Sequence, residues 1–419
     1  MTFPLEKSLR VKSFSTMDPN QLFEMALQLG SGWKVVRSEF CGEPRRLELW
    51  LDFLPGTKFP DPQSGELCPV HDTSNKQWRH LNFWQYETIL HARVPRIRNT
   101  AGDVRLVDVP WARAGSGFTL MMEAFVLLLC QQMPVASVAE MLGIHDTLLW
   151  RILAYYVEKA QAERSWAGVD SVLVDETSAR KGHRYVTNVL NAKSRELLLM
   201  VEGRESTALR AFAEELAHHG GSAEQIKLIG MDMSPAYIKG AKEHFPEARI
   251  VFDRFHVMLM AGRALDEVRK ELRRAGADLS GDLWALRGNE WTRSKEQLER
   301  RRKACAQYPK LGRAMMLREA LQDILESEDE HSLRWWCWRA SVSRLEPFKK
   351  LAASIREHWK GIVAFMQTRI TNGAIEAVNG LLQLAKRMAR GFRSFRNFQL
   401  MAYLKAGKLK LNLPSLSPT

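Results

Sequence analysis

An apolar strand that ends in two carboxylates is the feature that most limits how this chain can fold. In SVLVDETSARKGHRYVTNVL, residues 171–190, Asp175 and Glu176 follow the first apolar run, and a basic turn leads into a second one. Short apolar runs bounded by turn residues predict strands of a buried sheet. Charged groups are costly in an apolar core, so this strand must deliver its acids to an open edge of the sheet.

Strand and helix patterns alternate after this stretch. Residues 171–203 predict three strands in series, and STALRAFAEELAHHG predicts an amphipathic helix that ends at a glycine. QIKLIGMDMS and ARIVFDRFHV predict two further strands, separated by the helix PAYIKGAKEHF. The strand over 226–233 ends at Asp232, as the strand over 171–176 ends at Asp175. Ends of neighbouring parallel strands converge at one edge of an open sheet, so we expect these two aspartates to meet.

A helix near the C-terminus supplies a third carboxylate. In TNGAIEAVNGLLQLAKR, one polar stripe is formed by Asn372, Glu376, Asn379 and Gln383. No Asp or Glu follows Glu376, whereas eight basic residues lie between positions 386 and 410. One carboxylate is therefore expected to face inward on a helix whose continuation suits a polyanion.

Three carboxylates held close together repel one another unless cations lie between them. Oxygen ligands without a nearby Cys or His pair favour Mg²⁺ or Mn²⁺. Two such ions would stabilise the attacking and leaving oxygens at a phosphodiester. Asp175, Asp232 and Glu376 are therefore the predicted catalytic residues and metal ligands.

Other charged groups near these acids have alternative roles. Asp253 also ends a strand and could replace Asp232 or support the ligands. His256 could orient a phosphate or a ligand, or cap the following helix. Side chains alternate along a strand, so Glu176 is expected on the opposite face from Asp175, as an ion-pair partner of Arg180 or Arg184.

Charge and composition limit the classes of binding partner and the cellular compartment. A net charge of +13 in 419 residues favours a polyanion, nucleic acid before a membrane surface. The longest apolar run, FTLMMEAFVLLLC, is too short for a membrane span, and the N-terminus lacks the apolar segment of a secretory signal. Five scattered cysteines form no disulfide framework, so a reducing cytoplasm is expected.

Residues 134–160 predict two helices joined by a tight turn at Gly143. This pattern suits a helix-turn-helix whose second helix enters the major groove, and an ordinary helical hairpin is the alternative. The exposed candidates for DNA contact are His145, Thr147 and Arg151. The residues with the spacing of packing side chains are Leu148, Ile152 and Tyr155.

Basic side chains elsewhere predict phosphate contacts. They are Lys181, Arg184, Lys386, Arg387, Arg390, Arg393 and Arg396. The stretch LRWWCWRA, residues 333–340, clusters three tryptophans in a charge-laced helical region. Core packing is the expected role of these tryptophans, and stacking on a flipped-out base is the alternative.

Long motifs over nearly the whole chain carry a family resemblance. They are WRHLNFWQYETILHARVPR, VPWARAGSGFTL, VDETSARKGHRYVTNVL, MDMSPAYIKG, IVFDRFHV and ITNGAIEAVNGLLQLAKRMARGF. In these motifs the chain resembles the DDE transposases of bacterial insertion sequences, specifically the ISL-three family. The resemblance implies that Asp175, Asp232 and Glu376 form the DDE triad, with Asn372 and Asn379 among the residues that support it.

The resemblance also implies a multidomain α/β architecture. The expected parts are a small β module (1–110), a helix-turn-helix domain (115–165), a ribonuclease H-like catalytic core in two parts (168–262 and 346–410), and a helical insertion between those parts (263–345). The implied activity is binding of terminal inverted repeats, metal-dependent cleavage of the element's ends, and attack of the freed 3′-hydroxyl on target DNA. A homodimer at the bacterial nucleoid is expected, since two ends must be cut together.

The β module departs from the family pattern. Relatives carry two zinc-binding knuckles built from Cys, or from Cys and His. Here Asp61 and Ser64 in DPQSG, and Asn99 and Gly102 in RNTAGDV, occupy the four ligand positions. A tetrahedral structural zinc site needs thiolate or imidazole ligands, so no zinc is expected.

Two other devices could hold the β module together. The first is an aromatic core made of Trp33, Trp50, Trp78, Phe83 and Trp84. The second is a replacement metal site made of Cys41, Cys68 and His71.

Three functions stay open at this level. The chain is an active strand transferase, a DNA-binding relic that acts as an end-binding repressor without catalysis, or a ribonuclease H-like nuclease that cuts without joining. The lost zinc ligands favour the relic, and the three acids in register favour the enzyme.

Overall fold

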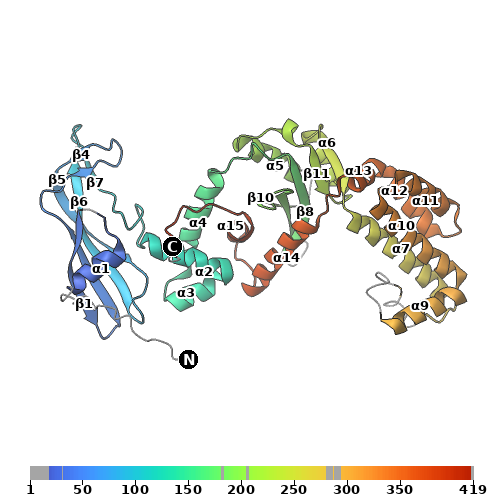
Figure 1. The fold of residues 1–419 in the computed structure, drawn as a ribbon, viewed down its shortest axis with the longest axis horizontal. Coiled ribbons are helices and arrows are strands. Elements are labelled where there is room, and N and C mark those ends of the chain that lie inside the picture. Colours follow the sequence, from blue (N-terminus) through green and yellow to red (C-terminus); the bar gives the residue numbers. More distant parts are fainter. Residues whose placement is uncertain are drawn as a thin grey trace, which may run out of the picture. The chain divides into compact units, whose positions relative to one another are not determined.

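The structure, a computed structural model, describes residues 18–30, 32–180, 184–203, 207–279, 286 and 294–416 (Figure 1). The chain divides into two compact units. The first comprises Met1–Leu153 with Leu411–Thr419, and the second comprises Ala154–Lys410.

The first unit opens with a short helix and a mixed sheet. The elements are α1 (Pro19–Leu27), β1 (Trp33–Cys41), β2 (Arg46–Phe53), β3 (Phe59–Pro60), β4 (Leu67–Cys68), β5 (Val70–Arg79), β6 (Glu87–Arg98) and β7 (Val104–Leu106). Four strands lie in the order β1-β2-β6-β5, β7 pairs with β6, and β3 and β4 form a separate hairpin. Buried and exposed residues alternate along much of β2 and β6, which gives this sheet one apolar face.

The expected aromatic core of this module is only partly correct. Trp33 and Trp78 are buried, and Trp111, which the sequence did not single out, packs edge-to-face against both. Trp84 is 80% exposed, because it lies in the tight connection between β5 and β6 rather than on the apolar face. Trp50 is half-buried and stacks on His91.

Three helices follow the β module. They are α2 (Leu120–Gln132), α3 (Val135–Leu142) and α4 (Asp146–Ala162). Gly143 ends α3 in the left-handed conformation with φ 64°, which a glycine adopts without strain. The expected pair of helices with a tight turn at this glycine is confirmed.

The second unit contains a five-stranded sheet. Its strands are β8 (Ser171–Arg180), β9 (Arg184–Asn191), β10 (Leu197–Glu202), β11 (Leu228–Met231) and β12 (Arg249–Phe252), in the order β10-β9-β8-β11-β12. The first three strands form an antiparallel meander, and β11 lies parallel to both β8 and β12. The predicted order of three strands, helix, strand, helix and strand is confirmed.

The prediction that the first strand ends at Asp175 is wrong. β8 continues to Arg180, because β9 pairs with its outer half and places Asn188 opposite Asp175. Only the pairing of β8 with β11 stops early, at Leu173. The predicted turn at Lys181 lies outside the described residues.

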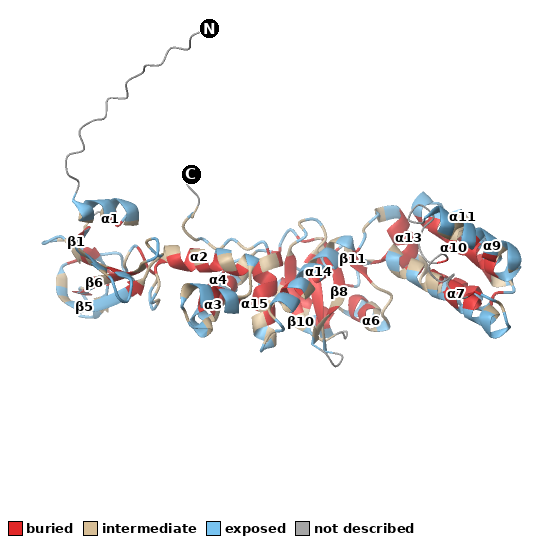
Figure 2. Cartoon of the chain, turned by 90° about the horizontal axis from the view of Figure 1, so that it is seen from below, coloured by how far each residue is buried: buried red, intermediate tan, exposed pale blue. Residues whose placement is uncertain are grey.

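The two faces of this sheet contact different helices. Val172 and Val174 of β8 belong to an apolar cluster that includes Phe212 of α5 (Thr207–His218) and Tyr237 of α6 (Pro235–His244). Asp175 lies on the other face, where α14 (Gly373–Met388) contacts β8. The strands between these helices are mostly buried (Figure 2). By alternation, Glu176 points to the face opposite Asp175, as expected.

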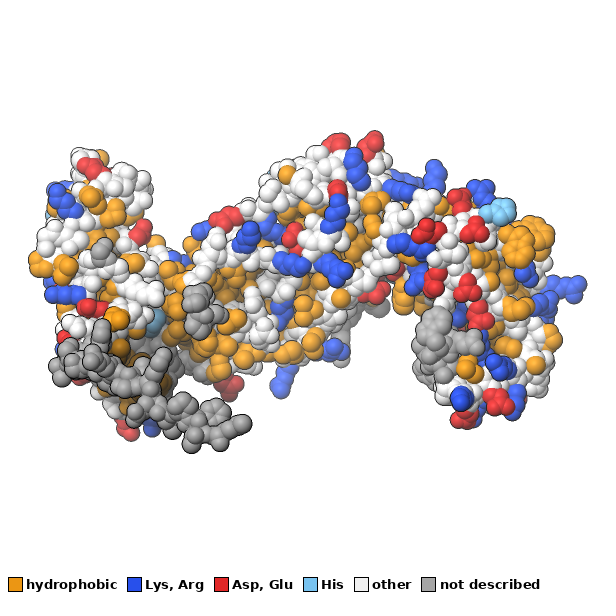
Figure 3. Space-filling model, viewed as in Figure 1, with side chains coloured by type: hydrophobic (Ala, Val, Ile, Leu, Met, Phe, Trp, Pro, Cys, Tyr) orange, Lys and Arg blue, Asp and Glu red, His pale blue; other side chains and the backbone are white. Residues whose placement is uncertain are grey.

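The second unit also contains further helices among its described residues. They are α7 (Arg254–Arg274), α9 (Lys295–Gln307), α10 (Pro309–Ser327), α11 (Glu330–Val342), α12 (Glu346–Glu357), α13 (Trp359–Thr368) and α15 (Phe395–Ala406). α7, α10, α11 and α12 pack on one another, and α13 packs on β12. Acidic and basic side chains are interspersed over the visible face of these packed helices (Figure 3).

The tryptophan cluster on α11 divides between the core and the surface. Trp336 is buried and donates its indole N–H to the carbonyl oxygen of Leu317 at 2.8 Å. Trp335 and Trp338 are more than half exposed. The expected core packing therefore holds for Trp336 and is wrong for the other two, because one helical face cannot bury three neighbouring positions.

Within the described ranges, no helix combines the length and the apolar character that crossing a bilayer requires.

Candidate functional site

The strand registers place three aspartates level with one another. Gly230 lies opposite Leu173, so two residues further along Asp232 is level with Asp175. Met231 lies opposite Phe252, so Asp253 is level with Asp232. Neighbouring strands lie about 4.8 Å apart, which puts Asp232 between the other two. This register supports the predicted proximity of Asp175 and Asp232, and the charge of Asp232 contributes to the raised pKa of Asp175.

Electrostatics at this edge are unfavourable for negative charge. Burial raises the pKa of Asp175 to about 6, and the charges of Asp232 and Glu376 add to the rise. The backbone N–H of Glu176 and the charge of His256 oppose it. Asp175 is therefore a carboxylate whose surroundings disfavour its ionised form unless a cation is added.

A polar stripe on α14 holds this helix against β8. Asn379 donates to Oδ2 of Asp175 at 2.8 Å. One turn later, Gln383 donates to Oγ1 of Thr177 at 2.7 Å and to the carbonyl oxygen of Ser178 at 2.8 Å. The predicted stripe therefore faces the strand that carries Asp175, and it fixes how far along β8 the helix lies.

A close approach at Gly230 positions the start of α14. A Cβ atom at this position would lie 2.6 Å from Cδ2 of Leu173 and 3.3 Å from Oδ1 of Asn372. Asn372 is buried at the N-cap of α14, and its carbonyl oxygen accepts the backbone N–H of Glu376. The glycine thus allows the first turn of α14, with Glu376, to lie beside the sheet edge.

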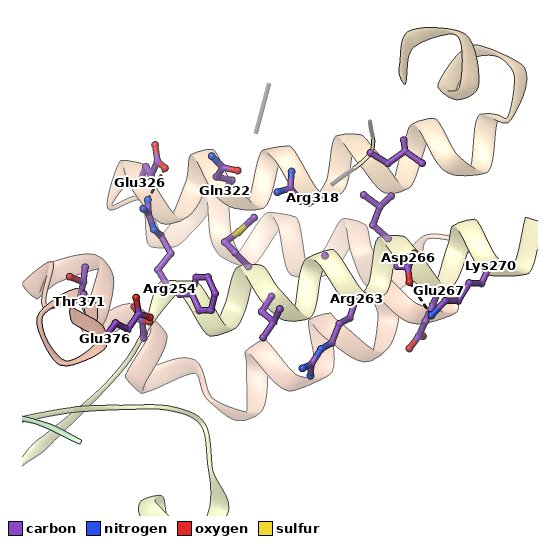
Figure 4. A pocket seen from close by; sticks show the side chains of 18 residues that line it. Arg254, Arg263, Asp266, Glu267, Lys270, Arg318, Gln322, Glu326, Thr371 and Glu376 are labelled. Atoms are coloured by element: carbon purple, nitrogen blue, oxygen red, sulfur yellow. Dashed lines mark hydrogen bonds and ion pairs between the residues drawn. The ribbon is translucent and has the colours of Figure 1, made fainter. Parts of the chain in front are cut away.

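Glu376 is exposed and lines a cavity of about 960 Å³ (Figure 4). Asp253 lines the same cavity, and Arg254 beside it forms an ion pair with Glu326 of α10 at 2.7 Å. Asp253 is buried at the N-cap of α7, and Nδ1 of His256 lies 3.9 Å from its Oδ2. His256 therefore lies in the first turn of α7, beyond the cap.

The donor set suits a hard divalent cation. Asp175, Asp232 and Glu376 offer carboxylate oxygens, and the cost of placing their charges together falls when a cation binds. Among the described residues, no three His, Cys, Asp or Glu side chains are already close enough to hold an ion. An exposed Glu376 in the first turn of its helix can change rotamer, which makes it the adjustable member of the set.

The helix-turn-helix candidates are exposed. His145, Thr147 and Arg151 all face solvent, and Nδ1 of His145 accepts the backbone N–H of Thr147 at the start of α4. Ile152 is buried as expected. The expectation that Leu148 and Tyr155 pack is wrong, because both lie on the exposed face of α4 at 37% and 40% exposure.

The basic C-terminal segment is only partly available to a ligand. Arg184, Arg387, Arg390, Arg393 and Arg396 are exposed, and Lys181 lies outside the described residues. Arg396 forms an ion pair with Glu158. Lys386 instead donates to the carbonyl oxygen of Ser178, so its ammonium group helps to hold α14 on β8.

Arg180, one of the two arginines expected to pair with Glu176, contacts backbone carbonyl groups. The Arg180 guanidinium donates to the carbonyl oxygens of Phe392 and Arg393. This contact ties the end of β8 to the segment between α14 and α15.

The four ligand positions of the β module form a polar cluster. Asp61 lies in the turn between β3 and β4, and its carboxylate accepts hydrogen bonds from Asn99 at 3.1 Å and from Arg105 at 3.1 Å to each oxygen. Gly65 and Gly102 adopt positive φ values in the two turns. The backbone N–H of Gln63 lowers the pKa of Asp61 to about 2, and Asn99 and Arg105 lower it too.

These residues do not fit zinc. Asp61 is already neutralised by a guanidinium, and Ser64, Asn99 and Gly102 offer neither thiolate nor imidazole. The alternative prediction of a replacement metal site is wrong. Cys41, Cys68 and His71 do not come together, and Cys68 donates to the carbonyl oxygen of Glu66.

Sequence reasoning missed two buried polar groups near the acids. Asn188 is fully buried in β9 and donates to Oδ1 of Asn379 at 2.7 Å. The hydroxyl of Tyr237, the other group, lies 2.8 Å from that of Thr187, and burial raises its pKa. The signal for Asn188 was an amide inside the apolar run YVTNVL.

Comparisons with known proteins agree with this architecture. A family model described as transposase, of the DDE type of the ISL3 family, matches residues 172–402. A second model, described as the helix-turn-helix domain of transposase family ISL3, matches residues 107–157.

Two curated relatives match over most of their length. The chain is 27% identical over 396 residues to the transposase for insertion sequence element IS1001 of Bordetella parapertussis, covering 88% of this chain and 94% of that protein. It is 27% identical over 376 residues to the transposase for insertion sequence element IS1557 of Mycobacterium tuberculosis, covering 81% and 83%. The chain belongs to the ISL3 family of transposases.

Proposed function

We propose that this transposase binds the terminal inverted repeats of its insertion sequence, cleaves the DNA ends and joins them to target DNA. Asp175, Asp232 and Glu376 are the proposed catalytic residues, in a ribonuclease H-like core. The observation that carries the proposal is the register that sets Asp232 level with Asp175, on the face where α14 carries Glu376. The order of a three-stranded meander followed by two parallel strands supports the ribonuclease H-like assignment.

Each acid has a distinct task in this proposal. Asp175 comes from within β8 and Asp232 directly follows β11, so both would hold one side of the site, and Glu376 would approach it from α14. Bound Mg²⁺ or Mn²⁺, two ions in the proposed form, supplies charge stabilisation at the attacking and leaving oxygens of the phosphodiester. No side-chain nucleophile is needed, because water and then the 3′-hydroxyl of the DNA attack phosphorus.

The remaining proposed contacts position DNA. His145, Thr147 and Arg151 at the start of α4 would contact an inverted repeat in the major groove. Arg184, Arg387, Arg390 and Arg393 would contact phosphates without reading sequence. A homodimer would bring the two ends together.

The test is Mg²⁺-dependent cleavage of DNA that carries the element's terminal repeats. The native chain should cut at the repeat boundary, and Asp232→Asn should bind the same DNA without cutting it. Asp170→Asn is the matched control, since Asp170 directly precedes β8 at its opposite end and pairs with Lys193. If the native chain and the control bind the repeats and neither cuts them, a non-catalytic end-binding protein becomes the better account. Cutting without joining to a target would favour a nuclease.

A further inference from the structure

Asn188 is a buried amide in an otherwise apolar stretch of strand. Its side chain is fully buried, and Val189 and Leu190 beside it are equally buried. Among the described residues, no group donates to its Oδ1. Burying an amide with one unmet group costs about 1–3 kcal/mol, so an apolar residue would serve stability better here.

The hydrogen bonds of Asn188 lead directly to Asp175. Asn188 donates from Nδ2 to Oδ1 of Asn379 at 2.7 Å, and Asn379 donates from Nδ2 to Oδ2 of Asp175 at 2.8 Å. Asn188 and Asp175 are also cross-strand partners, so they lie on the same face of the sheet beneath α14. The three side chains are therefore linked in one line of hydrogen bonds.

The chemistry of the group fixes both amide orientations. An ionised carboxylate only accepts hydrogen bonds, so Asn379 must turn Nδ2 toward Asp175. Its Oδ1 then faces Asn188, which must present Nδ2 in turn. Without the donor on Asn188, Oδ1 of Asn379 would lose its partner, and the Asn379 amide would be held less firmly in the orientation that donates to the carboxylate.

We propose that Asn188 and Asn379 form an amide relay that positions the Asp175 carboxylate to receive a divalent cation. Asn379 holds one carboxylate oxygen, and Asn188 acts as a positioning residue through Asn379. The proposal rests on the proposed function, since it assigns Asp175 a cation. It explains why a polar side chain is kept at a site where stability favours an apolar one.

Gln383 provides a matched control on the same helix. It also donates two hydrogen bonds from α14 to β8, but they end on Thr177 and Ser178 rather than on Asp175. A role limited to docking α14 would make Gln383→Leu and Asn188→Ala equivalent. If Asn188 positions Asp175, only Asn188→Ala should change cation binding.

The experiment measures Mn²⁺ binding to the DNA-free full chain by the electron paramagnetic resonance signal of free Mn²⁺. The half-saturating Mg²⁺ concentration for cleavage and the urea unfolding midpoint are measured on the same proteins. Asn188→Ala should weaken Mn²⁺ binding, and raise the half-saturating Mg²⁺ concentration, by about ten- to hundredfold. Gln383→Leu should lower the unfolding midpoint and leave both cation measurements unchanged.

A double variant guards against misfolding. Asn188→Leu/Asn379→Leu replaces both amides with apolar side chains, which is often neutral for stability. It should unfold near the native midpoint and still bind Mn²⁺ more weakly than the native chain.

Two results would overturn the relay while leaving the proposed function intact. One is native-like Mn²⁺ binding by Asn188→Ala, and the other is equal weakening in Gln383→Leu. A native chain that neither binds Mn²⁺ nor cleaves DNA would remove the proposed function, and the relay with it.

Discussion

Asp61 and Asp175 are both partly or fully shielded from solvent in parts of the chain that contain a sheet. Their surroundings shift the carboxylate pKa in opposite directions. Asp61 is met by a guanidinium, an amide and a backbone N–H, and its pKa falls to about 2. The pKa of Asp175 rises to about 6, with burial as the main cause and with the charges of Asp232 and Glu376 adding to the rise. The fold gives Asp61 an ion-pair partner, whereas the Asp175 carboxylate accepts a hydrogen bond from Asn379 but is opposed by the negative charges of Asp232 and Glu376.

The contrast distinguishes Asp61, a structural acid, from Asp175, for which we propose a role in cation binding. Ionisable groups whose surroundings disfavour the charged form are common at functional sites. There, a bound ligand can stabilise the charge. The rise in the pKa of Asp175 corresponds to a cost on the order of 2–3 kcal/mol at neutral pH in the absence of a cation. The β module lacks the ligands for zinc, and the Asp61 cluster takes over the space between the two turns.

The largest expected effect is on cleavage by Asp175→Asn. Loss of one carboxylate from the cation site should lower the rate of cutting at the repeat boundary by at least about 10³-fold. DNA binding, measured by gel shift, should be retained. Cleavage within tenfold of the native rate would show that Asp175 is not part of the site.

The matching change in the β module should act on stability instead. Asp61→Asn removes the buried one of the two carboxylates that Arg105 contacts and leaves only the exposed Asp103, so the thermal midpoint of the full chain should fall by several degrees. In buffer without Mg²⁺ or Mn²⁺, EDTA should not change the native midpoint, because the cluster needs no zinc. A fall in that midpoint on chelation, restored by zinc, would show that a metal holds this module.

The contribution of Asp61 should depend on pH in a defined direction. Its pKa is lowered in the folded state, from 3.8 to about 2, so its stabilising effect is complete above about pH 4 and is lost as the pH falls toward 2. The difference in midpoint between the native chain and Asp61→Asn should therefore shrink over that range. A difference that stays constant down to pH 2 would mean that the carboxylate charge has no role.

The smallest expected effects are on DNA binding by two adjacent basic side chains, one exposed and one engaged within the fold. Arg387 is exposed, whereas Lys386 is engaged by the carbonyl oxygen of Ser178. Arg387→Ala should weaken DNA binding and reduce the slope of log affinity against log salt by about 1. Lys386→Ala should leave that slope unchanged and lower the unfolding midpoint, and equal slopes for both variants would erase the distinction.

Local patterns predicted the sheet of the second unit well, because apolar runs bounded by turn residues mark its strands. Apolar runs that end at Asp175 and Asp232 located both acids, and helical spacing placed Asn379 and Gln383 on one face of α14. The same patterns missed the true end of β8, because pairing with β9 extends a strand past the point where its apolar run stops.

Long-range polar pairing was beyond reach of the sequence. Asp61 and Arg105 lie 44 residues apart and follow no period, so nothing local indicates their contact. A single amide such as Asn188 within an apolar strand looks like ordinary variation. Helical spacing likewise places Leu148 and Tyr155 on one face of α4 but does not show whether another element covers that face. Both residues were therefore expected to be buried.

The most direct test of the contrast is the free energy of unfolding of Asp175→Asn in metal-free buffer at neutral pH, beside Asp61→Asn. Removing a charge that burial and neighbouring carboxylates disfavour should leave the stability of the second unit unchanged or raise it, while Asp61→Asn destabilises the chain. A loss of stability in Asp175→Asn as large as that in Asp61→Asn would contradict the account, because Asp175 would then be a structural acid as well.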